Sequence, residues 1–226
     1  MLSFFKHYKI FAIVFGVISV IIISIIYNTL NVYQPLPIYQ PSMVSTELVD
    51  STIQHKKKYH KIADFSLINQ NGNIVTQNDY KDKIYVADFF FTTCQTICPI
   101  MTNHMVKIQK EILNDDDVML LSHSVTPEID SVAQLKQYAI KKGVNDDKWN
   151  LVTGDKKEIY QLARKSYLAV KDNGDGGPFD MVHTENFMLI DKKRQIRGFY
   201  DGTDPEEINR LLKDISILKE EYAKLE

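Results

Sequence analysis

The sequence predicts a three-layer α/β sandwich, in which helices cover both faces of a mostly parallel sheet. Continuous apolar runs of strand length occur at 84–91 and 117–125, as expected for strands buried on both faces. A segment with helical spacing of apolar residues follows each run, and this alternation is typical of α/β folds. Apolar residues make up 44% and charged residues 25% of the chain, a balance that excludes disordered and low-complexity classes.

The first elements of the sheet come before these two runs. Residues 63–68 and 73–77 flank an Asn-Gly pair, which predicts an antiparallel hairpin at one edge of the sheet. The run at 84–91 then leads into a segment with helical periodicity. Its apolar positions are Ile97, Met101, Met105 and Ile108.

The second half of the domain continues the alternation and ends in a hairpin and a helix. The charged turn Asp-Lys-Lys-Arg predicts the hairpin, and an Asp-Pro pair is typical of a helix start. The expected elements are a helix over 127–142, a strand over 149–154, a helix over 155–168 with Asp155 as its N-cap, strands at 186–191 and 195–201, and a helix from Asp204 and Pro205.

An uncharged apolar run at 10–27 precedes this domain, and its length of about 18 residues is enough to cross most of a bilayer core. Lys6 and Lys9 precede the run, and no Lys or Arg follows until Lys56, so residues 1–9 are expected to stay cytoplasmic. A cleaved signal peptide is the alternative, but the run ends in Ile, Tyr and Asn rather than in small residues. The pattern therefore favours an uncleaved transmembrane signal anchor.

The segment after the run, 28–60, is rich in proline and reads as a stalk or as a strap lying on the domain. Its charged end at 55–61 is interpreted as a solvated linker. The folded domain is expected over 61–226, about 165 residues, which suffices for one core. Because the N-terminus lacks the character of a transit peptide, we expect a single-pass protein of the bacterial inner membrane with its domain in the periplasm.

The overall charge bears on the partner. Lys and Arg total 27 against 29 Asp and Glu, and the formal net charge is -2. Proteins that bind nucleic acid usually carry a clear surplus of cationic residues. The composition therefore argues against nucleic acid as the main partner.

The only two cysteines of the chain, Cys94 and Cys98, lie where the buried run at 84–91 becomes a helix. Free amides and the helix dipole at such a junction stabilise thiolates. Two thiolates four residues apart can face the same side of a helical turn and bind one metal ion. The spacing also permits a reversible disulfide, whereas a purely structural disulfide is disfavoured because closing so short a ring removes little chain entropy.

Six histidines are candidates for a further ligand. His104 lies nearly opposite Cys98 in helical angle and is expected at the surface, and His123 falls within a predicted strand and is expected in the core or at an edge. His183 follows a glycine-rich loop and directly precedes a predicted strand, so it can reach the cysteine helix. A loop histidine alone is usually a surface residue. The remaining three, which precede the apolar run or lie in the linker, are poor candidates: His7, His55 and His60.

Three segments together resemble the SCO/SenC family of membrane-anchored copper proteins: DFFFTTCQTICPIMT, VTPEID at 125–130 and DMVHTENFMLID at 180–191. The likeness extends from Lys61 to the end of the chain. It implies a thioredoxin-like fold with a peroxiredoxin-style N-terminal extension. One departure is the run Thr-Pro-Glu-Ile-Asp, where the family commonly has an Asp-Pro-Glu-Arg-Asp type run, so a partner surface at this place can differ.

The resemblance also implies a function. It implies that Cys94, Cys98 and His183 bind one copper ion, as Cu(I) or Cu(II), in a metallochaperone rather than an enzyme. The implied partner is subunit II of cytochrome c oxidase, whose dinuclear copper centre would be matured, and a further periplasmic copper donor is left open. Soft thiolates favour Cu(I), and an added imidazole lets the site hold Cu(II) as well. A disulfide between Cys94 and Cys98 would abolish binding and make loading redox-gated.

Other functions use the same residues. A dedicated thiol–disulfide reductant would keep the copper-ligand cysteines of the oxidase reduced, and it would need Cys94 and Cys98 but not His183. General oxidoreductases have two residues between their cysteines and a cis-proline before the following strand, and this chain has three residues and no proline between Pro178 and Pro205. A peroxidase and a structural zinc module are less well supported, because the supporting arginine and a fourth ligand are not evident.

Overall fold

The computed structural model describes residues 8–30, 35–45, 49–170, 182 and 184–224. The chain divides into two compact units, Met1–Pro35 and Leu36–Glu226. In its described residues the first unit contains one helix, α2 (Lys9–Leu30), which includes the apolar run. None of the helices in the described residues has both the length and the apolar character needed to cross a membrane.

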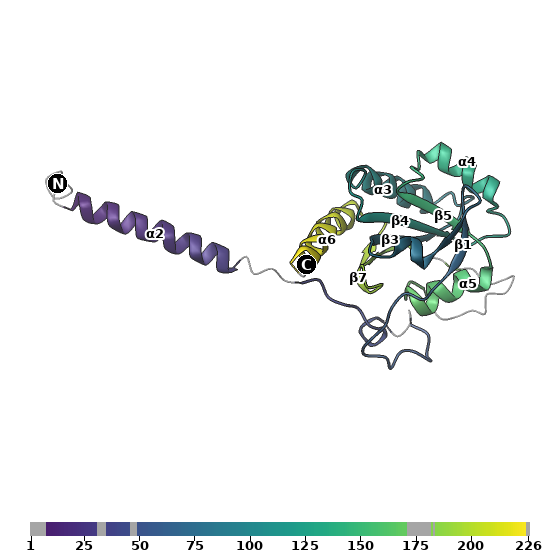
Figure 1. Ribbon diagram of the computed structural model, residues 1–226, viewed down its shortest axis with the longest axis horizontal. Helices are drawn as coiled ribbons and strands as arrows, with labels where there is room; N and C mark the ends of the chain where they lie inside the picture. The colour runs from purple at the N-terminus through teal and green to yellow at the C-terminus, as the bar shows by residue number, and fades with distance from the viewer. Residues whose placement is uncertain (1–7, 31–34, 46–48, 171–181, 183, 225–226) are drawn as a thin grey trace. The chain divides into compact units, whose positions relative to one another are not determined.

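The second unit is built on one mixed sheet of seven strands in the order β2-β1-β5-β4-β3-β6-β7 (Figure 1). The expected hairpins at the start and the end of the domain are both present and form the two edges. The strands are β1 (Ser66–Asn69), β2 (Ile74–Thr76), β3 (Ile84–Phe90), β4 (Val118–Ser124), β5 (Trp149–Thr153), β6 (Asn186–Ile190) and β7 (Ile196–Asp201).

The prediction of a mostly parallel sheet is wrong. Among the described strands, only the pairs β3–β4 and β4–β5 are parallel, and the other four pairings are antiparallel. Two neighbouring strands can be parallel only if a crossover returns the chain to the end of the sheet where the previous strand began. Strand β6 instead begins at the end of the sheet where β3 finishes, and so it runs antiparallel to β3. The direction of a strand that follows a long loop cannot be read from its own sequence.

Two layers of helices cover the sheet, as predicted. On one face, Val86 and Phe90 of β3 share a buried cluster with Met101 and Met105 of α3 (Cys98–Glu111), and α4 (Val132–Lys142) and α6 (Pro205–Ala223) complete this layer. On the other face, Phe89 packs in a cluster with residues of α5 (Lys156–Gln161). Alternate residues of a strand point to opposite faces, so a strand buried along its whole length requires both layers.

Local side chains determine where the helices begin. Ser131 accepts a hydrogen bond from the Gln134 amide, so α4 begins at Val132 rather than at 127. Asp155 caps α5 as predicted. The third helix then widens into a π-helix, η3 (Leu162–Ser166), which the periodicity did not predict. Two short 3-10 helices, η1 (Pro41–Met43) and η2 (Gln77–Tyr80), complete the described elements.

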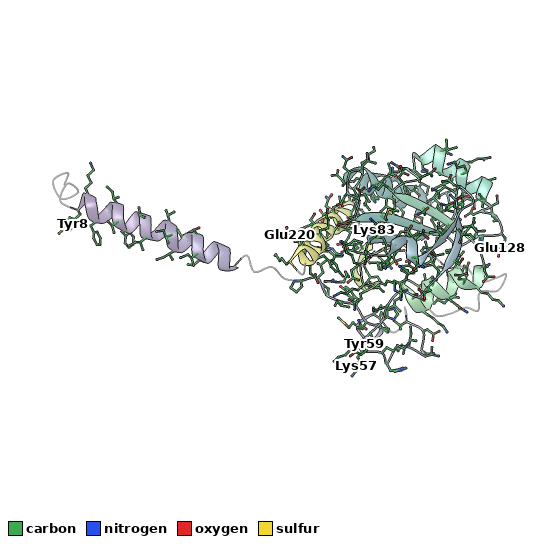
Figure 2. The ribbon with its side chains drawn as sticks, in the orientation of Figure 1. Tyr8, Lys57, Tyr59, Lys83, Glu128 and Glu220 are labelled. Carbon is green, nitrogen blue, oxygen red and sulfur yellow. The ribbon has the colours of Figure 1, made fainter. Side chains whose placement is uncertain are left out.

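The segment before β1 lies on the domain as a strap. The buried Arg197 guanidinium donates to the Leu36 carbonyl (2.7 Å), and the Tyr39 amide donates to the Ile196 carbonyl of β7 (2.8 Å). Its charged end is mostly solvated, as expected, and Lys57 and Tyr59 project from the surface (Figure 2). His60 is the exception, because it is buried, with Nε2 2.7 Å from the Ser166 carbonyl.

Candidate metal centre

Cys94 and Cys98 lie at the junction of β3 and α3, as the sequence predicts. The chain leaves β3 through a turn in which the Cys94 amide donates to the Phe91 carbonyl (3.3 Å), and α3 begins at Cys98. The Cys94 sulfur accepts a hydrogen bond from the Cys98 amide (3.4 Å) and lies 3.6 Å from the Thr96 hydroxyl. The Cys94 sulfur is therefore the hydrogen-bond acceptor for one of the first amides of α3, which have no acceptor within the helix.

The two thiols are free and differ in environment, since Cys94 is half-buried and Cys98 is buried. Burial raises the pKa of Cys94, but hydrogen bonds from the Cys98 amide and from Thr96 outweigh it and bring the pKa down to about 7. Burial raises the pKa of Cys98 to about 12, and the nearby Cys94 adds to the effect. Near neutral pH a substantial fraction of Cys94 is therefore thiolate, whereas Cys98 is a protonated thiol, which a soft metal ion can deprotonate.

Polar side chains support Cys98 from two neighbouring elements. The Thr102 hydroxyl donates to the Cys98 carbonyl (2.7 Å) and lies 2.7 Å from the hydroxyl of Tyr138 on α4. On β3, Asp88 is buried in the same face of the sheet, and its Oδ1 has no hydrogen-bond partner among the described residues. Burial raises the pKa of Asp88 to about 7, although a hydrogen bond with Ser122 opposes the increase. Sequence reasoning missed this carboxyl, and a charge inside the apolar run at 84–91 was the available signal.

His183 and the glycine-rich loop at 171–181 lie outside the described residues. Their described neighbours Val182 and Thr184 are buried. Strand β6 is antiparallel to β3, with Met188 opposite Ala87. The chain therefore enters β6 at the end of the sheet where β3 finishes. Over the residues with a described placement, no group of three His, Cys, Asp or Glu side chains is arranged to hold a metal ion.

Two other histidines have structural roles. His123 is fully buried on the sheet face opposite α3, where it stacks on Phe89 with 4.8 Å between ring centroids. Burial lowers its pKa to about 4, and its place in the core is as predicted. His104 was expected at the surface, but it is half-buried, with Nδ1 2.7 Å from the Gly202 carbonyl. This contact joins α3 to the turn after β7, which helical angle alone does not reveal.

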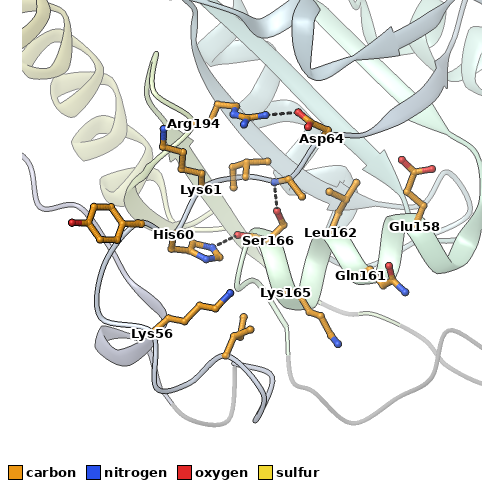
Figure 3. Close-up of a pocket in the computed structure, with 14 residues that line it drawn as sticks. Lys56, His60, Lys61, Asp64, Glu158, Gln161, Leu162, Lys165, Ser166 and Arg194 are labelled. Carbon is orange, nitrogen blue, oxygen red and sulfur yellow. Dashed lines mark hydrogen bonds and ion pairs between the residues drawn. The ribbon is translucent and has the colours of Figure 1, made fainter.

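A cavity of about 600 Å³ lies away from the thiols, between the strap and η3 (Figure 3). His60 and Ser166 meet in its wall, and its charged groups are partly paired, since Arg194 pairs with Asp64 and Lys165 with Asp50. Neither cysteine lines it. The candidate metal centre is therefore separate from this cavity.

Comparison with protein families resolves which proteins share this arrangement. The SCO1/SenC family model matches residues 53–218, most of the second unit. The chain belongs to the SCO1/SenC family. Among its SCO1/SenC relatives, the SCO1 protein homolog of Bacillus subtilis is 32% identical over 158 residues, which cover 69% of this chain and 81% of the relative.

Solved SCO structures agree in fold. BsSco, described as a member of the Sco family of cytochrome c oxidase assembly proteins with a disulfide switch, superposes with a TM-score of 0.60 at 32% identity, covering 70% of this chain and 92% of that one. Bradyrhizobium japonicum ScoI, solved with copper bound, gives 0.54 at 28% identity, covering 69% and 98%. The thioredoxin-like α/β fold that the sequence resemblance implied is thereby confirmed.

Proposed function

We propose that this SCO1/SenC protein binds one copper ion as its cargo through Cys94, Cys98 and His183, and delivers it to subunit II of cytochrome c oxidase. The observation that carries the proposal is the pair of free thiols at the N-terminus of α3, one of them with a lowered pKa. Relatives support it, because ScoI of Bradyrhizobium japonicum has been solved with copper bound and BsSco is described as an oxidase assembly protein.

The donor set fits copper chemically. Two thiolates are soft ligands that suit Cu(I), and an imidazole extends the site to Cu(II). Cys94 is accessible and has its pKa lowered to about 7, so it is the first sulfur to engage an incoming ion, and Cys98 then loses its proton to the medium. His183 belongs to the segment that leads into β6, and β6 begins at the end of the sheet where β3 finishes. This position supports His183 as the third copper ligand. Partner ligands would replace these three one at a time.

The contrast between the two thiols also favours a second function, that of a reductant dedicated to the oxidase cysteines. In this reaction the Cys94 thiolate attacks a disulfide sulfur of the partner, and Cys98 then displaces the partner sulfur. The products are a Cys94–Cys98 disulfide and a reduced partner. A general oxidoreductase is less well supported, because three residues separate the cysteines and no proline lies between Pro178 and Pro205.

We further propose that the apolar run at 10–27 anchors the chain in the bacterial inner membrane, with the domain in the periplasm. The support is the uncharged run of the sequence and the lysines that precede it. Extraction of membranes with alkaline carbonate tests this anchor. A protein that stays with the lipid supports it, and a protein released into the supernatant refutes it.

The copper site is tested by anaerobic titration of the reduced full chain with Cu(I) and with Cu(II). We expect one ion per chain, and His183→Ala should weaken Cu(II) binding more than Cu(I) binding. His104→Ala is the matched control, because this histidine already contacts the Gly202 carbonyl and should leave both affinities unchanged. Unchanged binding of both oxidation states by His183→Ala would exclude the three-ligand site.

Mixing the copper-loaded chain with apo subunit II separates the two functions. Movement of copper to subunit II supports delivery. Reduction of a subunit II disulfide without movement of copper supports the reductant.

A further inference from the structure

A second buried carboxylate lies close to the cysteines, in the turn that connects β4 to α4. Asp130 has no exposed surface and accepts four hydrogen bonds. Its donors are the Thr92 hydroxyl (2.5 Å), the Thr92 amide (3.2 Å), the Ser124 hydroxyl (2.6 Å) and the Thr126 hydroxyl (3.1 Å). No Lys or Arg among the described residues forms an ion pair with it, so these neutral donors compensate the loss of hydration.

Two of the four hydrogen bonds are directed at the loop that carries the cysteines. Thr92 lies two residues before Cys94, inside the turn that the Cys94 amide closes on the Phe91 carbonyl. The Thr92 hydroxyl also accepts a hydrogen bond from the side-chain amide of Gln134 on α4 (3.1 Å). Thr92 is therefore held at its backbone and at its side chain, by the β4–α4 turn and by α4. The turn that places the Cys94 sulfur is thereby tied to two neighbouring elements.

We propose that Asp130 is a positioning residue for the thiol pair. Its carboxylate fixes Thr92, Thr92 fixes the turn from Phe91 to Cys94, and this turn holds the Cys94 sulfur against the Cys98 amide at 3.4 Å. Asp130 itself touches neither sulfur in any described hydrogen bond. Its function is to keep the two sulfurs at the spacing that a shared metal ion or a disulfide requires, and in this sense the proposal rests on the proposed function.

The chain offers a matched control in Asp191. This carboxylate is also buried and accepts hydrogen bonds from the Lys193 amide (2.9 Å), the Gln195 amide (2.8 Å) and Arg197 (3.1 Å). It lies in the β6–β7 turn, at the end of the sheet where β3 begins. Removing it should loosen the fold without moving the cysteine loop.

The test is the rate of Cys94 alkylation by iodoacetamide at pH 7 in the reduced, metal-free full chain, measured by mass spectrometry and divided by the rate in urea. We expect Asp130→Ala to lower this ratio about fivefold, the change expected when one hydrogen bond to the sulfur is lost. Thr92→Val, which replaces the hydroxyl by a methyl group, should lower it in the same direction. Thr92→Ser, which keeps the hydroxyl, should restore the wild-type ratio.

The outcomes decide the proposal. A wild-type ratio in folded Asp130→Ala or Thr92→Val refutes it, and so does an equal decrease in Asp191→Ala, because the effect would then be general loosening. If Asp130→Ala does not fold, the comparison of Thr92→Val with Thr92→Ser decides. The assay contains no copper, so a wild-type chain that binds no copper would refute the proposed function and leave this comparison valid.

Discussion

Replacing the buried acid of β3 by its amide, Asp88→Asn, should change how stability depends on pH. The pKa of Asp88 is raised from 3.8 to about 7 because the carboxylate is buried, so the folded chain retains a proton that the unfolded chain loses in this range. The contribution of Asp88 to stability is therefore fully present below pH 4 and is lost as the pH rises toward 7. At about 1.4 kcal/mol for each pKa unit, the loss is about 4 kcal/mol.

His123 acts in the opposite direction. Its pKa falls from 6.5 to about 4 on burial, so its contribution to stability increases as the pH rises from 4 to 6.5, by about 3 kcal/mol. In the wild-type chain the two contributions nearly cancel over this range. In Asp88→Asn the opposing Asp88 contribution is absent, so stability should rise with pH between 4 and 6.5.

Urea unfolding of the reduced, metal-free chain at pH 4.5, 5.5, 6.5 and 8 measures this difference. The fluorescence of Trp149 is a suitable probe, because this single tryptophan is buried and donates to Ser122 (2.8 Å). At each pH, the free energy of unfolding of the wild type is subtracted from that of the variant, and the differences at the four pH values are compared. Packing effects that do not depend on pH then cancel. Asp147→Asn, at an exposed position, is the control. A difference that is the same at pH 4.5 and pH 8 would refute the reasoning.

Three further predictions follow from the described contacts. The rate of Cys94 alkylation should increase with pH with a midpoint near pH 7, and Cys98 should stay unreactive at that pH. Equal alkylation rates of the two thiols across this range would contradict the difference in their pKa values. Arg197→Ala should lower the free energy of unfolding by about 3–5 kcal/mol, because it leaves the buried Asp191 unpaired, and a Tm within a degree of wild type would count against this ion pair. Met105→Ala should cost about 2–5 kcal/mol through a core cavity, measured by urea unfolding, and a negligible loss would mean that the neighbouring side chains close the space.

The sequence alone was sufficient for the features that depend on neighbouring residues. The apolar run at 84–91 has the length and composition of a strand buried on both faces, and the strand found there is buried throughout. Cys94 and Cys98 follow that strand directly, so their location at a helix N-terminus depends on a short stretch of chain. Asp155 caps its helix for the same reason, because a cap is formed within a few residues.

Only the tertiary structure decided the features that join distant segments. The direction of β6 depends on the end of the sheet at which the chain re-enters it, because the residues of β6 are equally suited to either direction. The sequence alone does not distinguish Asp88 from Asp130. In the described part of the chain, Oδ1 of Asp88 has no hydrogen-bond partner, whereas Asp130 accepts hydrogen bonds from Thr92 of the cysteine loop. Burial and hydrogen bonding are properties of what surrounds a side chain, and those surroundings come from segments far apart in the sequence.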